Sequence, residues 1–458
     1  MKQLLKLLQT NFVLIVICLL FLGTRLFRID SIPASVYWDE ASIGYNAYSI
    51  LTTGKDEWGE FLPLHFRAFG EFKLPVYIYS VVASQFVFGM NTFALRFPAV
   101  IFGLFSIIGL YLLVLQLTKQ KSVSLLSFFL FSITPWFFIF SRTGYEAVAG
   151  LALFIWATYF LLKSATEKKH LFLSTMLFIG SFYSYNSFRI LTPIVLGLGF
   201  VYHLYKKQFA VLILSVLVLS ASFFPLYKLY KHDSGLSRLQ AVGSSTIFTN
   251  YLKNFSPTFL FIDGDSNPRS QIPGESQLYY LDAIFLALGV LYILKSKNPK
   301  LFIVLGLLLL APIPASITKE NPHALRSILM SPMLSIISAL GIYYLSEIFK
   351  KQKQIILIAV VVLYTLSFEG YMYKFGTVYN DLSVNVWQYE YKEIFERQKE
   401  GCVSDQYAQP YIFALYYNKV DPNYFIDTRE LNPVSDWGFS TVKSFGSYTF
   451  PKVCGETN

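Results

Sequence analysis

Apolar runs recur along the chain from residue 11 to residue 372, and short polar stretches separate them. A helix of about 20 apolar residues can cross a bilayer, because it satisfies its own backbone hydrogen bonds inside the lipid. By this criterion the sequence predicts an all-α polytopic membrane protein with about eleven spanning helices. The predicted spans are residues 11–29, 96–117, 122–140, 146–162, 171–186, 188–204, 209–228, 277–294, 301–317, 326–347 and 355–372.

Two apolar segments need a separate interpretation. Residues 11–29 resemble a signal peptide, but Arg25 and Arg28 come without a small-residue cleavage site, so we predict a retained signal-anchor helix. Residues 74–89 are apolar but short, and a crossing there would invert every later loop. We therefore predict interfacial or re-entrant helices at this point, inside the first outer loop.

Lysine-rich connections alternate with connections that carry acidic residues. Lysine clusters mark the cytoplasmic side of polytopic proteins, so the N-terminus is predicted to be cytoplasmic and the C-terminal region extracytoplasmic. The outer loops are then residues 30–95, 141–146, 187, 229–276, 318–325 and the tail from 373. The clustered lysines are Lys2, Lys6, Lys119, Lys121, Lys163, Lys168, Lys169, Lys206, Lys207, Lys295, Lys297, Lys300, Lys350, Lys351 and Lys353.

Composition agrees with a location in the cell membrane. Hydrophobic residues make up 54% of the chain and charged residues 14%, whereas about a quarter of a soluble domain is charged. The net charge of +10 could indicate a nucleic-acid partner. The lysine clusters between apolar segments already account for that charge, so no nucleic acid is expected.

The polar C-terminal region predicts a small α/β unit. We divide the chain into a transmembrane domain, residues 1–372, and an extracytoplasmic domain, residues 373–458. Within the second, residues 386–400 and 409–418 are predicted helices, and 438–450 alternates like a strand. Cys402 and Cys454 could form a disulfide outside the cytoplasm, but their spacing leaves a free pair equally open.

The first outer loop contains the main acidic candidates, in SVYWDEASIGYNAYSILTTG. Asp39 and Glu40 stand just before an amphipathic stretch that Gly54 ends, which places Asp39 at or near a helix N-cap. Asp39 could serve only as that cap. Two ionisable residues at the membrane edge also indicate catalysis.

Further charged residues occur in the same loop and the next one. Lys73 follows Glu71 and precedes a proline, and a lysine at headgroup level suits a phosphate; the alternative is an ordinary snorkelling lysine. The second outer loop, SRTGYEAVAG, holds Arg142 and Glu146. These two are candidates for substrate binding and catalysis, or they could pair with each other.

The later outer loops add weaker candidates. Arg326 lies three residues after His323, and arginine suits bidentate phosphate binding, while Arg189 opens another helix on the same side. Asp263-Gly264-Asp265 resembles a metal motif, but glycine between two aspartates is common turn chemistry. The surrounding loop, with Asp265 and Arg269, could shape a substrate site. Phosphate-binding loops, dinucleotide fingerprints, zinc spacings and nucleophile elbows are not found, so nucleotide donors are not expected.

Five motifs in this order resemble the C-type-fold (GT-C) membrane glycosyltransferases of the protein O-mannosyltransferase and aminoarabinose-transferase superfamily. They are YWDE at 37–40, GEFKLP at 70–75, ALRFPA at 94–99, SRTGYE at 141–146 and HALR at 323–326. The catalytic subunits of oligosaccharyltransferases resemble the chain more distantly. Leu74 separates Lys73 from Pro75 where members often have Lys-Pro-Pro. Ser42 stands where the aminoarabinose transferases carry arginine, so their substrate is not assumed.

The resemblance implies a polyprenyl-phosphate-linked sugar as the donor. It implies Asp39 as the catalytic carboxylate and Glu146 as the second acidic position. Lys73 and Arg326 would hold the donor phosphate. A divalent metal on Glu71 or His323 is a further possibility that the resemblance raises, and no other cofactor is implied.

The residue types permit one chemical scheme in particular. Asp39 would take the proton of an acceptor hydroxyl, and the cations would stabilise the charge on the departing phosphate. A single carboxylate base predicts direct displacement and inversion at the sugar carbon. The alternatives are a transporter or lipid flippase, and a non-catalytic scaffold. A transporter tends to place polar groups at the midplane between inverted repeats, which this sequence does not show.

Overall fold

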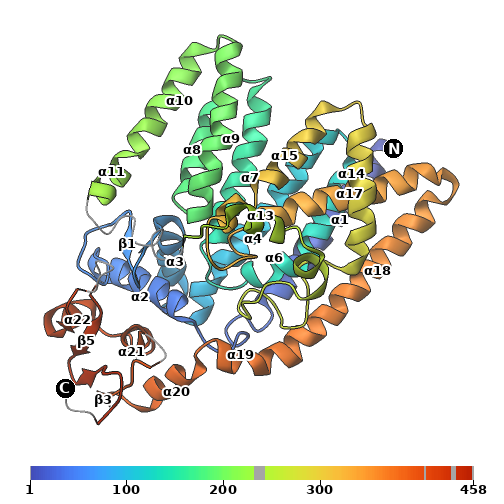
Figure 1. The fold of residues 1–458 in the computed structure, drawn as a ribbon. Helices are drawn as coiled ribbons and strands as arrows, with labels where there is room; N and C mark the ends of the chain where they lie inside the picture. The colour runs from blue at the N-terminus through green and yellow to red at the C-terminus, as the bar shows by residue number, and fades with distance from the viewer. Residues whose placement is uncertain (1, 232–242, 407–408, 435–439, 456–458) are drawn as a thin grey trace.

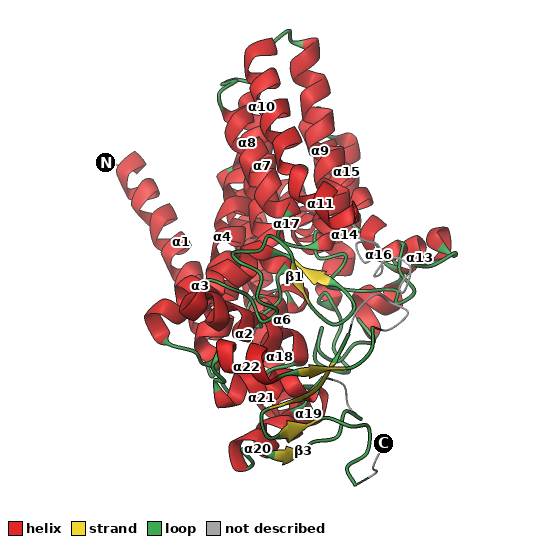
Figure 2. Ribbon diagram, turned by 90° about the vertical axis from the view of Figure 1, so that its left-hand side faces the viewer, coloured by secondary structure: helices red, strands yellow, loops and turns green. Residues whose placement is uncertain are grey.

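The structure is a computed structural model that describes residues 2–231, 243–406, 409–434 and 440–455. Helices dominate it (Figure 1; Figure 2). Within the described ranges, seven helices or helical stretches have the length and apolar character needed to cross a membrane. Four shorter apolar helices accompany them. The multi-pass α-helical class is therefore confirmed, while the count of eleven spans stays a prediction.

The elements follow in chain order. The helices up to the long outer loop are α1 (Lys2–Leu26), α2 (Trp38–Thr53), α3 (Pro75–Phe88), α4 (Thr92–Thr118), α5 (Lys121–Ile133), α6 (Pro135–Phe140), α7 (Ala147–Ser164), α8 (His170–Phe182), α9 (Asn186–Tyr205), α10 (Phe209–Ser222) and α11 (Phe224–Lys231). Those after it are α13 (Ile247–Lys253), the π-helix η2 (Thr258–Ile262), α14 (Tyr280–Lys295), the 3-10 helix η3 (Pro299–Leu301), α15 (Phe302–Leu310), α16 (Ile313–Ser316), α17 (Met330–Ile348), the 3-10 helix η4 (Lys350–Gln352), α18 (Lys353–Lys374), the π-helix η5 (Phe375–Tyr379), α19 (Asn380–Val386), α20 (Tyr389–Arg397), α21 (Pro410–Asn418) and α22 (Pro422–Thr428). The strands are β1 (Phe66–Arg67), β2 (Phe72–Lys73), β3 (Gly401–Cys402), β4 (Glu430–Leu431), β5 (Val442–Phe445) and β6 (Tyr448–Thr449).

Prolines divide two of the predicted spans. The predicted span 122–140 becomes α5 and α6, which meet at Thr134 and Pro135. The predicted span 301–317 becomes α15 and α16, with Pro312 between them. A proline has no backbone N–H to donate and disfavours helical backbone in the residue before it, so each helix ends there.

The short apolar segment after Lys73 forms α3. This helix has 14 residues, which at about 1.5 Å per residue is well below the roughly 30 Å of a bilayer core. It packs against α2 and α4. A short helix inside the first outer loop is therefore present where residues 74–89 predicted one.

The helices α14 and α17 approach each other very closely. A Cβ added at Gly289 would collide with the Ile337 carbonyl of α17, and one added at Gly341 would collide with the Phe285 carbonyl of α14. Small residues at such a crossing allow backbones to pack without bulky side chains between them, as in other membrane helix pairs. Asp282 adds a polar link here, because it accepts hydrogen bonds from Ser338 and from Tyr364 of α18.

The C-terminal region packs against the first outer loop (Figure 1). One buried apolar cluster contains residues of α2, α3 and the start of α4 together with residues of α20, α21, α22 and β5. The rings of Tyr45 and Phe425 are among its contacts, 6.4 Å apart. The spanning helices share a second, larger cluster.

The predicted elements of the C-terminal region are largely confirmed. Helices α20 and α21 occur where residues 386–400 and 409–418 predicted them. The predicted strand over 438–450 is instead the β5–β6 hairpin, because Gly446 turns the chain at φ 51°; residues 438 and 439 lie outside the described part. A continuous helical stretch, Lys350–Val386, crosses the proposed division at residue 372, which stays a prediction.

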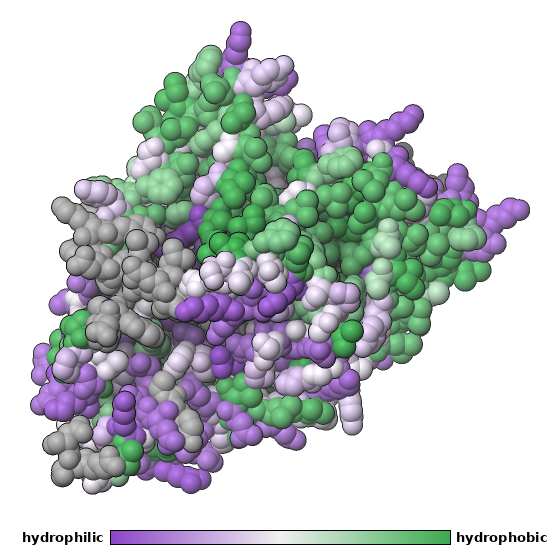
Figure 3. Space-filling view, in the orientation of Figure 1, coloured by the Kyte–Doolittle hydropathy of each residue, from purple (hydrophilic) through white to green (hydrophobic). Residues whose placement is uncertain are grey.

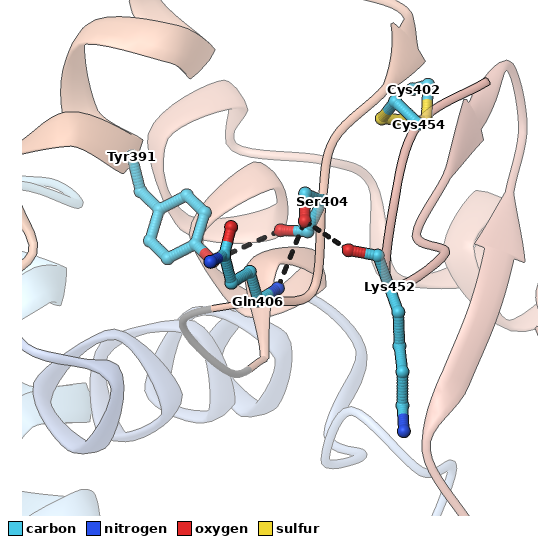
Figure 4. The surroundings of a disulfide bond; sticks show 6 residues. All are labelled: Tyr391, Cys402, Ser404, Gln406, Lys452 and Cys454. Carbon is cyan, nitrogen blue, oxygen red and sulfur yellow. Dashed lines mark hydrogen bonds between the residues drawn. A yellow bond between two sulfur atoms is a disulfide. The ribbon is translucent and has the colours of Figure 1, made fainter. Parts of the chain in front are cut away.

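Cys402 and Cys454 form a disulfide across a sequence separation of 52 residues (Figure 4). It joins β3 to the segment after β6. Beside it, the Ser404 hydroxyl donates to the Lys452 carbonyl oxygen at 2.5 Å, and the Tyr391 hydroxyl donates to the Ser404 carbonyl oxygen (Figure 4). The disulfide between Cys402 and Cys454, which the sequence left open, is therefore present.

Surface hydropathy separates the molecule into two zones. Hydrophobic side chains cover the upper helical part in Figure 3, whereas hydrophilic ones gather over the lower part, where the C-terminal region lies. Helix α10 is an extreme case, because Leu212 and Ser215 are its buried residues and most of its apolar side chains are exposed. Lipid is the environment in which such an apolar surface is stable.

Candidate functional site

Asp39 lies in the first turn of α2. The N-cap position belongs to Tyr37, whose backbone is extended and whose side chain makes no capping hydrogen bond. Asp39 is therefore close to the cap, as predicted, without being the cap itself. A carboxylate in a first turn is favoured by the helix dipole. Gly54 ends the helix at φ 73°, as expected.

The β1–β2 hairpin brings Lys73 to Asp39. The Lys73 ammonium lies 2.5 Å from Asp39 Oδ1 and 3.8 Å from Glu71 Oε1. The Lys73 side chain is buried, whereas 28% of the Asp39 side chain is exposed. The hairpin thus presents a desolvated cation to a carboxylate that solvent or substrate can reach.

Glu146 reaches the same group from the start of α7. Burial raises the pKa of Glu146 to about 7. The positive charge of Lys73 lowers this pKa, whereas the negative charges of Asp39 and Glu71 raise it. Burial alone would lower the pKa of Lys73, but Asp39, Glu146 and Glu71 together raise it above its ordinary value. Glu146, from the second outer loop, is therefore close enough to influence Lys73 together with Asp39 and Glu71, and a common role for these residues stays a prediction.

Arg269 adds a second cation beside Asp39. Its guanidinium carbon lies 3.9 Å from the centre of the Tyr37 ring. Burial by itself would lower the pKa of Arg269. Tyr145, Tyr37 and Asp39 together have the larger, opposite effect, so the pKa of Arg269 lies above its ordinary value. The loop after η2 therefore closes over the residue that precedes α2. We call Asp39, Lys73, Glu71, Glu146 and Arg269 the acidic-cationic group.

Asp265, His323 and Arg326 belong to a neighbouring cluster. Asp265 Oδ1 accepts from the Asn267 amide and Oδ2 from the Ala324 amide, so this carboxylate ties two loops together. Gly264 has φ 69°, a left-handed backbone that glycine adopts readily, which agrees with the turn interpretation of Asp263-Gly264-Asp265.

The other two members of this cluster lie around Glu320. The ring of His323 lies 3.6 Å from Asp265 and 3.8 Å from Glu320. The Arg326 guanidinium donates to Thr318 at 2.7 Å and to Glu320 at 3.3 Å, in the turn before α17. Arg269, which lies over the Tyr37 ring, follows Asp265 by four residues in the same loop, so this loop links the two clusters.

Arg189 opens α9 and pairs with a histidine that the sequence did not single out. Its guanidinium donates to His65 Nε2 at 2.9 Å. Burial, together with the Arg189 charge, lowers the pKa of His65 to about 4. His65 is therefore neutral at physiological pH and acts as the acceptor of this bond.

The placement of Glu40 does not support a direct catalytic role. Glu40 is 1% exposed, and both of its oxygens accept from Arg96, at 3.0 and 2.9 Å. The Gly144 amide donates to it as well. Arg96 in turn donates to the carbonyls of Ile29, Pro33 and Ser35. The pair fixes α2 against α4, so Glu40 is a structural partner of the site.

Arg142 also differs from its expected role as a substrate contact. It is fully buried, and its guanidinium donates to the carbonyls of Thr24, Phe27 and Ile32 at the end of α1. These donors hold the chain between α1 and α2. The side chain cannot reach a substrate without breaking this anchor.

The residues proposed as metal ligands do not form a metal centre. Within the described ranges, no group of three histidine, cysteine or acidic side chains could hold an ion. Glu71 faces the Lys73 ammonium, which repels a cation. Both oxygens of Asp265, the carboxylate nearest His323, already accept backbone amides. We therefore assign no step to a metal.

Glu57 joins the first outer loop to the C-terminal region. It is fully buried, and its Oε1 accepts from Trp58 Nε1 at 2.9 Å and from the Tyr411 hydroxyl at 3.3 Å. Burial and Asp56 raise its pKa to about 8 from an ordinary 4.5. We expect the free energy of unfolding to fall as pH rises from about 4.5 to 8, because the unfolded chain has lost a proton that the folded chain keeps.

The measurement is thermal unfolding in detergent across that pH range, for wild type and Glu57→Gln. The amide cannot titrate, so the variant should lose part of the pH dependence. Identical pH dependence in both proteins would show that Glu57 is not the group responsible.

Arg96 was quoted in a motif but not predicted as a site residue, and Tyr37, Tyr145 and His65 were not predicted either. The only available signal for Arg96 was a charged residue inside an apolar span, which is costly unless it is paired. The aromatic residues gave no such signal, because single tyrosines do not stand out in a chain with 32 Tyr and 44 Phe.

Comparison with known proteins supports the resemblance. Residues 73–227 match the family model described as dolichyl-phosphate-mannose-protein mannosyltransferase. No curated protein sequence matches the chain. Among solved structures, ArnT from Cupriavidus metallidurans in the apo state is similar, with TM-score 0.59, 10% identity, and coverage of 91% of this chain and 85% of that one.

Two further structures extend the comparison. ArnT from the same organism, bound to undecaprenyl phosphate, aligns with TM-score 0.52, 13% identity, and coverage of 90% and 74% of the two chains. The Archaeoglobus fulgidus oligosaccharyltransferase, in complex with zinc and sulfate, aligns with TM-score 0.51, 12% identity, and coverage of 85% and 56%. The chain thus spans little more than half of the archaeal enzyme. The helical architecture, the family match and these structures together show that the chain is a polytopic membrane protein with the fold of the C-type glycosyltransferases.

Proposed function

We propose that the protein transfers a sugar from a polyprenyl-phosphate donor to an acceptor hydroxyl, with Asp39 as the general base. The observation that carries this proposal is the acidic-cationic group: an accessible carboxylate 2.5 Å from a buried ammonium, with Glu146 and Arg269 beside them. Two of the similar structures hold lipid phosphates: ArnT from Cupriavidus metallidurans is bound to undecaprenyl phosphate, and an Archaeoglobus fulgidus oligosaccharyltransferase is in complex with a dolichol-phosphate.

The chemistry follows from which charges change during transfer. The acceptor oxygen attacks the anomeric carbon, its proton passes to Asp39, and the bond from that carbon to the phosphate oxygen breaks. The departing phosphate gains negative charge, which Lys73 and Arg269 are placed to stabilise. We propose Arg326 and Arg189 as more distant contacts of donor or acceptor. One direct displacement inverts the configuration at the anomeric carbon.

We propose that the site faces the extracytoplasmic side, as the lysine pattern predicts. The disulfide between Cys402 and Cys454 supports this orientation, because disulfides persist in oxidising compartments. The C-terminal region that carries it packs on the same loop as Asp39. Both then lie on one side of the membrane.

The test is transfer from a panel of polyprenyl-phosphate sugars to candidate hydroxyl acceptors, using purified protein in detergent. We expect one donor to be consumed, with product of inverted anomeric configuration. Product that retains the donor configuration would contradict a single displacement. Movement of labelled polyprenyl phosphate across proteoliposomes without any sugar transfer would favour the flippase alternative.

A further inference from the structure

We propose that Trp38 is a positioning residue, which orients the Asp39 carboxylate for proton abstraction through a hydrogen bond from its indole N–H. Trp38 Nε1 donates to Asp39 Oδ2 at 3.1 Å, while the Lys73 ammonium contacts the other oxygen, Oδ1. The two donors approach opposite oxygens of one carboxylate. This inference rests on the proposed role of Asp39 as base.

Trp38 is held in place by the residue before it, by the β1–β2 hairpin and by the residue before α20. Its ring centre lies 5.1 Å from that of Tyr37 and 5.7 Å from that of Phe69, which follows β1. The Trp38 backbone amide donates to Gln388 Oε1 at 3.1 Å, from the residue before α20. A ring packed in this way cannot swing its N–H away from Asp39 without disturbing its neighbours.

The two contacts make the carboxylate oxygens unequal. Oδ1 faces a full positive charge, which reduces its affinity for a proton, whereas Oδ2 faces a neutral indole that can only donate. A carboxylate oxygen can accept more than one hydrogen bond. We therefore assign proton abstraction to the Oδ2 side of the carboxylate, whose orientation the indole N–H fixes.

Removing the indole N–H has a defined electrostatic consequence. A hydrogen bond to the charged form of an acid favours that form, so its loss makes Asp39 easier to protonate. Charged and titratable groups that the described part of the chain places around Asp39 stay unchanged in such a variant. They include Tyr37, Glu71, Lys73, Tyr145, Glu146 and Arg269.

The test compares Trp38→Phe with wild type, as full-length protein in detergent, by steady-state kinetics across pH. Phenylalanine keeps an aromatic ring but has no N–H. We expect kcat to fall by about tenfold or more, the KM for donor to change little, and the acid limb of the kcat profile to move to higher pH. Wild-type kcat and an unmoved acid limb in a folded Trp38→Phe protein would overturn the proposal.

The chain provides a control, because Trp58 Nε1 also donates to an acidic side chain, that of Glu57, at 2.9 Å and outside the acidic-cationic group. Trp58→Phe should leave the acid limb where wild type has it; an equal shift in both variants would overturn the assignment. If Trp38→Phe does not fold, Trp38→Gln keeps an N–H donor that does not titrate and should keep the wild-type acid limb, and a shifted limb in that variant counts against the proposal. Wild-type protein without any transfer would instead refute the proposed function.

Discussion

Replacing Asp39 by asparagine is expected to lower sugar transfer by about 10²–10⁴-fold, the usual contribution of a positioned general base. Asparagine has nearly the same shape and still accepts a hydrogen bond from Trp38, but it cannot take a proton. Lys73 loses its ion pair at the same time. Binding of polyprenyl phosphate should persist, since the cations remain. The measurement is kcat with saturating donor, together with the dissociation constant for polyprenyl phosphate.

A suitable control is Asp30→Asn, which removes an exposed carboxylate from the same outer loop. Its turnover should match wild type. If Asp39→Asn keeps wild-type turnover with an unchanged melting temperature, Asp39 is not the base, and Glu146 becomes the carboxylate to test. Its pKa of about 7 would suit it to proton transfer near neutral pH.

Replacing Arg96 by methionine is expected to destabilise the fold by about 3–5 kcal/mol, the usual cost of breaking a buried ion pair. The substitution leaves the Glu40 carboxylate buried, with Gly144 as its remaining backbone donor. It also leaves the carbonyls of Ile29, Pro33 and Ser35 without their donor. Thermal unfolding in detergent measures the loss.

The same substitution at Arg397 is the control. Arg397 pairs with Glu393 at 3.7 Å on the surface of α20, with most of its side chain exposed. An exposed pair contributes about 1 kcal/mol or less, so Arg397→Met should melt close to wild type. Equal melting temperatures for the two variants would show that the Glu40–Arg96 pair does not hold the loop between α1 and α2.

Local patterns accounted for the helices and for several of their ends. Gly54 ends α2 where the sequence predicted, because its left-handed backbone suits a residue without a side chain. The prolines that divide two spans were visible in the sequence, yet hydropathy alone treated each span as continuous. Hydropathy measures how strongly a segment prefers lipid. It does not record that a proline removes a backbone hydrogen-bond donor and ends a helix.

For the candidate site, too, the sequence indicated some features and missed others. Asp39, Lys73 and Glu146 were predicted to meet in one pocket. The structure places the Lys73 ammonium 2.5 Å from Asp39, and the role of the three residues stays a prediction. Glu40 and Arg142 carry the same kinds of charge but are buried against Arg96 and against backbone carbonyls. The sequence indicates that a charge stands at a membrane edge, but it does not indicate where the side chain points.

By itself the sequence determined the membrane class, the approximate helices and the polar zone, because each depends on the kinds of residue in a short segment. It also offered Asp39 and Lys73 as the predicted carboxylate and cation of the site. Only the tertiary structure decided which charged side chains contact each other and which are buried. It also decided that Trp38 donates to Asp39 and that the C-terminal region packs on the first outer loop. These contacts join residues up to several hundred positions apart, such as Trp38 and Gln388. Such pairings depend on how whole helices pack, and no local pattern records that packing.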